Sequence, residues 1–345
     1  MKRKLALILT TVLTLSLLAA CGSKGETPSS GSSAGSGQTS EASWPASKTV
    51  EIYVPFAAGG NSDLTARVFA DALNKKTGAN FVVVNQTEGN GAVCYNTIAN
   101  APADGSVIGW VTPSWFTSYF AGSHDLKPTE KFSTVAVTTA CTSQYLIVPK
   151  DSPFNTVQDL VDYCTAHPGE LLFGMQLGSA SHYYAENARQ NLGVDWNYVE
   201  TGSGDTNRVT AIMGNIIQAT SVSVVSAQQY YEAGEIKVLA ALYKPEITPE
   251  SLKDIPTLEE AGYSDITVKN CNFLYGPKMD DATCEAMNKV FTEMFNDPAV
   301  QQQLTDLSQD QVICKDYAEA TTMVTELYDS YRSIADSLGI LAPGM

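Results

Sequence analysis

Basic and histidine side chains are scarce in this chain, and their scarcity limits what it can bind. The 345 residues include 21 lysines and arginines against 37 aspartates and glutamates, with 3 histidines and a formal net charge of −16. A nucleic-acid partner is disfavoured, because no basic stripe is present to displace the counterions of phosphate groups. The acidic balance also repels anions at long range, so an anion site must depend on short-range hydrogen-bond donors.

Common catalytic and metal-binding motifs are also missing. The three histidines lie far apart, and the chain contains neither H-E-x-x-H nor C-x-x-C. Its one G-x-S-x-G match, residues 31–35, lies in a serine- and glycine-rich stretch and not at a strand-to-helix turn, so it is no nucleophile elbow. Residues 89–91 (Gly-Asn-Gly) begin like a dinucleotide fingerprint, but Cys94 stands where the third glycine is needed. We therefore expect no cofactor, no metal and no enzymatic activity. A hydrolase that uses His182 with Ser179 or Ser181 is the enzyme alternative.

The chain's long hydrophobic run lies at its N-terminus, and it is too short to span a membrane. Lys2-Arg3-Lys4 precedes an apolar stretch from Leu5 to Leu18, and Ala19-Ala20-Cys21-Gly22 follows. Because a spanning helix needs roughly 20 apolar residues, residues 1–20 predict a secretory signal peptide. The ending resembles a bacterial lipoprotein processing site with Cys21 as the lipidated residue. An ordinary signal peptide with an incidental cysteine is the alternative.

Residues 21–47 are rich in serine and glycine and lack an apolar period, which predicts a disordered tether. The folded part would begin at Lys48 and be held outside the cytoplasm on the cell membrane by the lipid anchor. Six further cysteines have wide, irregular spacings, and both disulfides and buried free thiols are consistent with them. They are Cys94, Cys141, Cys164, Cys271, Cys284 and Cys314.

Strand-like and helix-like patterns alternate along the remaining 300 or so residues, a length that suits two domains. This alternation predicts an α/β fold with mostly parallel sheets flanked by helices. Strands are expected near 50–54, 81–84, 107–111, 146–148, 171–173, 196–199, 216–222 and 236–242, with a nearly all-helical end from 281 to 338. In such sheets, ligands bind beyond the carboxyl ends of the strands.

Four loops after expected strands are small and polar, and we interpret them as a shared ligand site. They span residues 55–63 (PFAAGGNSD), 112–114 (TPS), 176–182 (QLGSASH) and 200–205 (ETGSGD). Glycine allows close backbone approach, and a helix N-terminus offers unpaired N–H groups with partial positive charge. Together they can hold a carboxylate without a basic side chain.

Each loop also has a plain structural interpretation, because glycine and serine are common in turns and helix caps. Asp63 and Arg67 are spaced for an ordinary ion pair on a helix face. Trp115, Phe116 and Tyr119 fit either a hydrophobic core or the wall of a cleft. For one loop alone the structural interpretation would prevail; four in one chain favour a site.

Several of these segments, in order, resemble the receptors of tripartite tricarboxylate transporters, also called the Bug family. The stretch VPFAAGGNSDLTAR (54–67) is similar to that family's opening motif, and LGSASH (177–182) resembles its glycine-serine-histidine loop. IPTLEEAGY (255–263) is similar to a third family segment. Where many members carry a lysine or arginine, Glu200 and Thr201 stand in this sequence.

The resemblance implies a two-lobed, type II periplasmic-binding-protein fold with a ligand cleft between the lobes. One lobe would comprise residues 48–145 and 268–345, and the other residues 146–267. The implied ligand is a small organic carboxylate such as a di- or tricarboxylate. The implied ligand-binding residues are Phe56, Ala57, Ala58, Gly59, Gly60, Asn61, Ser62, Asp63, Gly178, Ser179, Ala180, Ser181, His182, Thr201, Gly202 and Ser203. The interpretation of the loop after residues 107–111 as part of the site adds Thr112 and Ser114.

A receptor of this family would close its lobes over the ligand and deliver it to membrane permease subunits. We expect a monomer that binds stoichiometrically without turnover. A surface receptor that reports the ligand to a signalling kinase is the alternative within the same fold.

Overall fold

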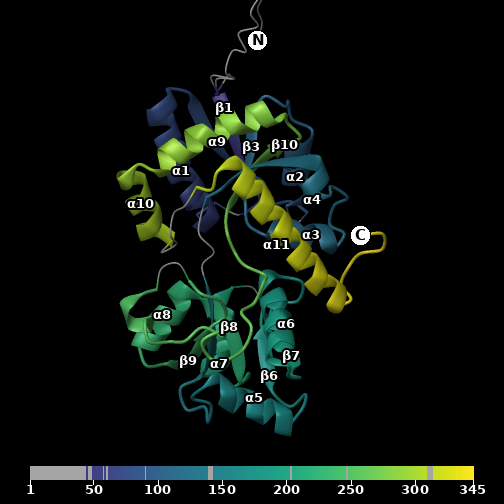
Figure 1. Cartoon of the computed structure of the whole chain (residues 1–345), viewed down its shortest axis with the longest axis vertical. Coiled ribbons are helices and arrows are strands. Elements are labelled where there is room, and N and C mark those ends of the chain that lie inside the picture. The colour runs from purple at the N-terminus through teal and green to yellow at the C-terminus, as the bar shows by residue number, and fades with distance from the viewer. Residues whose placement is uncertain are drawn as a thin grey trace, which may run out of the picture. The chain divides into compact units, whose positions relative to one another are not determined.

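The computed structural model describes residues 44–45, 49–56, 58–59, 61–89, 91–138, 143–202, 204–245, 248–308 and 314–345 (Figure 1). The predicted signal peptide, Cys21 and most of the predicted tether lie outside these ranges. So do Ala57, Gly60, Cys141, Ser203 and the side chain of Asn61. None of the helices in the described ranges is long and apolar enough to cross a membrane.

The first sheet is built by the early part of the chain and one late strand, in the order β2-β1-β3-β10-β4. Strands β1 to β4 run in one direction, and β10 runs antiparallel to its neighbours β3 and β4. The strands are β1 (Thr49–Val54), β2 (Asn80–Asn85), β3 (Val107–Val111), β4 (Phe132–Val137) and β10 (Phe273–Pro277).

Helices cover both faces of the first sheet. On one face, α1, α9 and α10 pack against alternate strand residues such as Ile52, Trp110 and Leu274. On the other, α2, α3 and α11 pack against residues such as Val111 and Phe273. The helices are α1 (Asn61–Thr77), α2 (Ala92–Ala99), α3 (Ser114–Phe120), the short α4 (Pro128–Lys131), α9 (Asp281–Phe295), α10 (Pro298–Ser308) and α11 (Tyr317–Ser337).

The second sheet has the order β7-β6-β8-β5-β9, and it repeats the same plan with β5 as the antiparallel strand. Helices α5 and α6 pack on one face, and α7 and α8 pack on the other. Its elements are β5 (Gln144–Pro149), α5 (Val157–Ala166), β6 (Leu172–Met175), α6 (Ala180–Leu192), β7 (Asn197–Glu200), α7 (Asp205–Met213), β8 (Ala219–Ser223), α8 (Val224–Glu232) and β9 (Ile236–Ala241), followed by a 3₁₀ turn at Glu250–Leu252.

The predicted α/β class with mostly parallel, helix-flanked sheets is therefore confirmed. Local sequence explains where many helices begin. Thr156 and Asp159 form a reciprocal capping box at α5, and the Ser223 hydroxyl accepts from the N–H of Ser226 at α8. The C-terminal helix α11 packs on β4 and α3, and it also contacts α6 of the second sheet. There the ring of Tyr331 lies 5.2 Å from that of Tyr183.

The burial of Trp44 differs from the prediction that residues 21–47 form a disordered tether. It is 8% exposed, and its indole N–H donates to the carbonyl of Gly105 at 3.0 Å. Its ring packs edge-on against Phe81 and Phe291. One large aromatic residue within a serine-rich segment buries enough apolar surface to join the core, so the ordered fold includes residues before Lys48.

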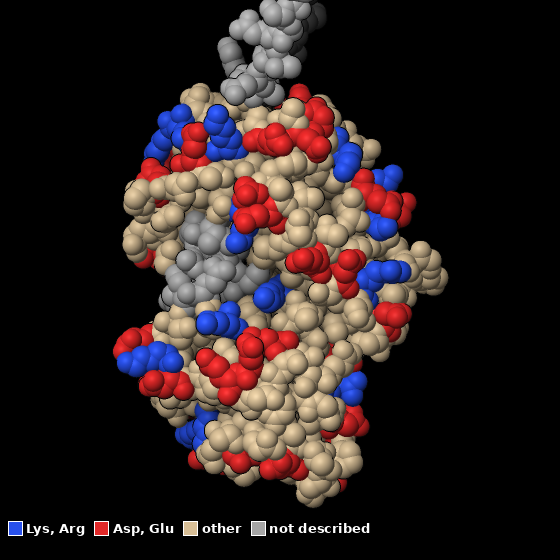
Figure 2. All heavy atoms as spheres, viewed as in Figure 1, with Lys and Arg blue, Asp and Glu red and all other residues tan. Residues whose placement is uncertain are grey.

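Acidic and basic side chains are interspersed on the face drawn in Figure 2. Neighbouring charges form ion pairs across and along helices. Examples are Lys76 with Glu293 at 3.0 Å and Lys127 with Glu130 at 2.6 Å. Such exposed pairs contribute little to stability, because water and salt screen them.

In the described ranges, Cys94, Cys164, Cys284 and Cys314 are free thiols, and all of these but Cys314 are buried. Burial raises the pKa of the Cys94 thiol to about 12, and it raises the pKa values of the Cys164 and Cys314 thiols to about 11.

Since the thiolate is the reactive form, we expect iodoacetamide at pH 8 to alkylate Cys94 at least tenfold more slowly in the folded chain than in guanidinium. Peptide mass spectrometry would measure both rates, and equal rates would contradict the buried, protonated thiol.

Candidate functional site

The loop after β1 is held in shape by a buried carboxylate. Asp63, in the first turn of α1, is 2% exposed. It accepts hydrogen bonds from the N–H of Gly59 at 2.8 Å, from the Asn85 amide at 2.9 Å and from Nε of Arg67 at 3.1 Å. The same Asn85 amide donates to the carbonyl of Phe56 at 3.0 Å. The end of β2 therefore fixes the loop that follows β1.

These contacts decide the charge state of Asp63. Burial by itself raises the pKa of this carboxyl, but the hydrogen bonds from Arg67, Gly59 and Asn85 outweigh it and hold the pKa below the ordinary value. The second carboxylate oxygen also lies 2.9 Å from Nη2 of Arg67. The ion pair expected from the i, i+4 spacing is confirmed, and Asp63 is a positioning group for the loop.

Thr112 and Ser114, which follow β3, bond to each other at the start of α3. The Thr112 hydroxyl donates to the Ser114 hydroxyl at 3.1 Å, and both residues are half-buried. The aromatic residues after them belong to the core: Trp115 is 1% exposed and stacks on Tyr275 with ring centroids 4.5 Å apart. Phe116 and Tyr119 are buried as well, so the core interpretation of these three residues holds.

Consecutive N–H groups of the loop after β6 are bound within the protein. Gln176 N–H donates to the Ser181 hydroxyl at 2.9 Å, and Gly178 N–H donates to Nδ1 of His182 at 3.3 Å. Between them, the N–H of Leu177 donates to the Glu200 carboxylate at 2.6 Å. This differs from the expectation that the loop's backbone donors are free to meet a ligand.

His182 is arranged as a structural acceptor. Its Nδ1 receives the N–H of Gly178, which places the proton of a neutral ring on Nε2. Burial lowers the pKa of His182, against the opposing effect of Glu186 and Glu200. The Ser181 hydroxyl bonds to Gln176 N–H and to the Ser179 hydroxyl, and across the described residues no hydrogen bond joins a serine hydroxyl to the His182 ring. The arrangement of a serine nucleophile and its base is therefore not formed.

Glu200, the last residue of β7, ties two loops together. Besides the N–H of Leu177, it accepts the N–H of Gly202 at 2.8 Å. Gly202 has φ of 80°, a conformation that glycine adopts without strain. Thr201 is fixed by its N–H, which donates to the carbonyl of Met175 at 2.9 Å.

The first residue of α7, Asp205, is paired in turn. It accepts from the N–H and the hydroxyl of Ser223, at 2.9 and 2.5 Å, and forms an ion pair with Arg208. This bond links the loop after β7 to the carboxyl end of β8. Asp205 thus helps to fix the loop without contributing an unpaired charge.

The structure thus brings the site residues together in two groups. Asp63 and Asn85 join the loops after β1 and β2, while Glu200 joins the loops after β6 and β7. In the described part of the chain, no hydrogen bond connects one group to the other. The residue motifs did not identify Asn85 or the clamping role of Glu200. Both residues share a pattern that could have identified them: a polar side chain at the last position of a strand, beside a glycine-rich loop.

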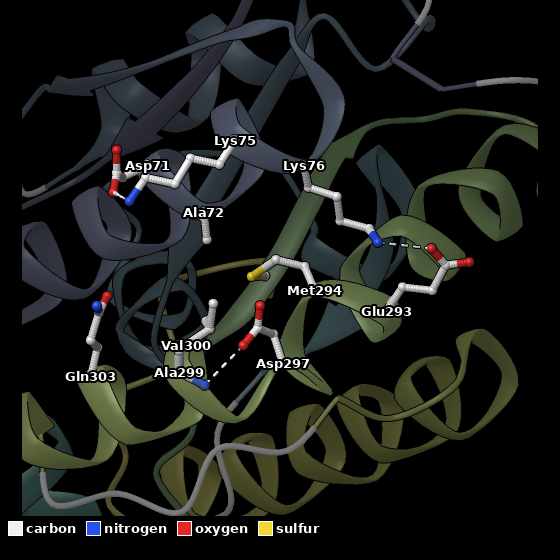
Figure 3. Close-up of a pocket in the computed structure, with 10 residues that line it drawn as sticks. All are labelled: Asp71, Ala72, Lys75, Lys76, Glu293, Met294, Asp297, Ala299, Val300 and Gln303. Carbon is white, nitrogen blue, oxygen red and sulfur yellow. Dashed lines mark hydrogen bonds and ion pairs between the residues drawn. The ribbon is translucent and has the colours of Figure 1, made fainter.

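A separate surface pocket of about 360 Å³ lies between α1, α9 and α10 (Figure 3). None of the predicted ligand-binding residues lines it. Its lysines are already paired, Lys75 with Asp71 at 2.6 Å and Lys76 with Glu293 at 3.0 Å. We therefore do not assign a ligand to it.

Comparison with solved structures identifies the fold. A TctC solute-binding protein from Polaromonas, solved without ligand, is 21% identical and superposes with a TM-score of 0.74 over 86% of this chain and 100% of its own. A protein of R. palustris with adipate is 23% identical (TM-score 0.67; 86% and 99%). MatC of the same species, with bound malate, is 21% identical (TM-score 0.63; 83% and 98%). The fold is the two-lobed α/β fold of periplasmic solute-binding proteins.

Comparison of sequences gives the family. A UPF0065 protein of Bordetella pertussis is 27% identical over 224 residues, which are 63% of this chain and 66% of that protein. The profile described as "Tripartite tricarboxylate transporter family receptor" matches residues 65–339. That match covers most of the chain and includes nine of the ten described strands, all but β1. The protein therefore belongs to the TctC family of tripartite tricarboxylate transporter receptors, and it is a substrate-binding receptor, not an enzyme.

Proposed function

We propose that this protein is a lipid-anchored, extracytoplasmic receptor that captures a small organic carboxylate and delivers it to a tripartite permease. Capture occurs by closure of two lobes, which we assign to residues 48–145 with 268–345 and to residues 146–267. A ligand that contacts both lobes stabilises the closed state, and the membrane subunits distinguish that state from the open one.

The observation that carries the proposal is the fixed geometry of the four post-strand loops. Each begins at the carboxyl end of a strand, where ligands of α/β sheets bind. The described residues of these loops are bound by polar side chains: Asp63 and Asn85 after β1, Thr112 and Ser114 after β3, and Ser181 and Glu200 after β6 and β7. Loops ordered before binding lose little entropy when a ligand arrives.

The solved relatives support a carboxylate as the ligand class, because one holds adipate and another holds malate. In this chain we assign the first wall of the site to Phe56 and residues 57–63, together with Thr112 and Ser114. The second wall is assigned to residues 178–182 and 201–203. The net charge of −16 requires that short-range donors, not the overall field, attract the ligand.

Anchoring and delivery complete the proposal. The basic start, apolar run and Cys21 predict a processed lipoprotein, and a serine-rich tether would hold the receptor close to its permease. Two or more acyl chains anchor a protein stably, because each buried CH₂ contributes about 0.8 kcal/mol.

A thermal-unfolding screen of the full chain in detergent tests the binding function. The panel contains mono-, di- and tricarboxylates together with the amide of each acid. A ligand at 100 times its Kd adds about 2.7 kcal/mol to the free energy of unfolding, a shift of several degrees for a chain of this size. We expect at least one carboxylate to stabilise the protein and its amide to fail. Stabilisation by amides or cations alone would contradict the proposal.

A further inference from the structure

In the wall of the site formed by the second sheet, four backbone N–H groups already have acceptors within the protein. The backbone N–H groups of Gln176, Leu177 and Gly178 already donate to Ser181, Glu200 and His182. The N–H of Gly202 donates to Glu200 as well. A ligand carboxylate approaching this wall therefore meets backbone donors that have acceptors of their own.

The same wall carries an exposed negative charge. Glu200 lies at the carboxyl end of β7 and is exposed, and among the described residues no basic side chain forms an ion pair with it. The neighbouring Asp205 is different, because Arg208 pairs with it. Burial lowers the pKa of His182, so its ring is not a cation that could offset Glu200 at neutral pH.

The opposite wall is electrically balanced. Its buried carboxylate, Asp63, is paired with Arg67 at 2.9 Å and is fully hydrogen-bonded. That wall also includes the N-terminus of α1, a helix of 17 residues whose dipole favours an anion. Helices α6 and α7 begin at the second wall in the same way, so the two walls differ chiefly in the exposed carboxylate of Glu200.

We propose that Glu200 determines specificity by selecting ligands that carry an ammonium group opposite their carboxylate. The inference rests on the proposed carboxylate-binding function and narrows it to small zwitterions whose two charged groups lie at opposite ends, that is, ω-amino acids. The ligand's carboxylate binds at the loops of the first sheet, and its ammonium donates to Glu200. A second carboxylate at that position would be repelled by Glu200 at close range, and the N–H groups of Gln176, Leu177, Gly178 and Gly202 already have acceptors.

Matched ligand pairs test this assignment by calorimetric titration of the full chain in detergent. The set pairs 3-aminopropanoate with succinate, 4-aminobutanoate with glutarate and 5-aminopentanoate with adipate, so that a carboxylate replaces the ammonium. In at least one pair we expect the ammonium compound to bind at least tenfold more tightly, equivalent to about 1.4 kcal/mol.

The variant Glu200→Gln removes the charge and keeps an acceptor oxygen. It should reduce the ratio of the two Kd values within such a pair at least fivefold. Glu170→Gln is the matched control, since Glu170 is exposed near the opposite end of β6, and it should leave the ratio within twofold. If Glu200 only clamps the loops, Glu200→Gln weakens both members of a pair equally, which overturns the proposal. If the wild-type protein binds the dicarboxylate as tightly as the ω-amino acid, or more tightly, in every pair, the proposal is also overturned. Failure of every carboxylate to bind refutes the proposed function itself.

Discussion

Replacing Asp63 by alanine should weaken ligand binding at least tenfold and destabilise the protein by about 2 kcal/mol. The variant removes the acceptor of the Gly59 N–H and one acceptor of the Asn85 amide. It also removes the ion-pair partner of Arg67, which keeps its hydrogen bond to the Asn85 side-chain oxygen. Breaking a fully buried pair costs about 3–5 kcal/mol, but Arg67 is 49% exposed and can turn to water, so we expect a smaller cost. The loop after β1 would lose its fixed shape, and affinity would fall with it.

Asp71→Ala is the matched control for this variant, because Asp71 lies on the same helix and pairs with Lys75. Both of those side chains are exposed, so the control should change the free energy of unfolding by less than about 0.5 kcal/mol. Chemical denaturation and calorimetric titration of both variants give the two quantities. Equal affinity in Asp63→Ala and wild-type protein would show that the loop does not need its carboxylate.

The pH dependence of stability tests the same contact independently. The folded-state pKa of Asp63 is lowered, so its ionised form contributes stability that is complete above the unfolded value of about 4. That contribution is lost as the pH falls through the lower folded-state pKa. The difference in unfolding free energy between wild-type protein and Asp63→Asn should therefore be largest near neutral pH and shrink below pH 4.

Local patterns located the loops of this protein better than they described their chemistry. The runs at 50–54 and 171–173 and the following helix signals predicted β1, α1, β6 and α6, because strand and helix periodicities are local. The partners of Asp63 and Glu200 could not be predicted in the same way. Asn85 is 22 residues from Asp63, and Leu177 is 23 residues from Glu200, so these contacts depend on strand order.

Two strands of the first sheet were missed for a related reason. Strand β10 is five residues long and fully buried, so it shows no polar alternation, and it follows a long irregular segment. Strand β4 begins directly after the short helix α4. Their pairing, Phe273 opposite Val137, joins residues far apart in the chain, and a local pattern contains no information about it.

Gly109→Ala should destabilise the protein by about 2–3 kcal/mol, even though it adds a single methyl group. Gly109 lies in β3 directly opposite Tyr275 of β10, and the tyrosine ring covers it. A Cβ at this position would lie 2.4 Å from Cε1 and 2.5 Å from Cζ of that ring. The ring cannot withdraw easily, because it is fully buried and stacked on Trp115 at 4.5 Å. Overpacking of this kind costs about 1–3 kcal/mol.

Two comparisons separate the clash from a general effect of removing glycine. Gly214→Ala is the matched control. Gly214 has a φ of −81°, and the nearest atom to a new Cβ there is the Thr210 carbonyl oxygen at 3.3 Å. The control variant should change the free energy of unfolding by less than about 0.5 kcal/mol. A double-mutant cycle with Tyr275→Leu then measures the coupling. If the ring causes the cost, Gly109→Ala should cost at least 1 kcal/mol less in the leucine background. An unchanged cost would place the strain in the backbone of β3 and not in the contact with Tyr275.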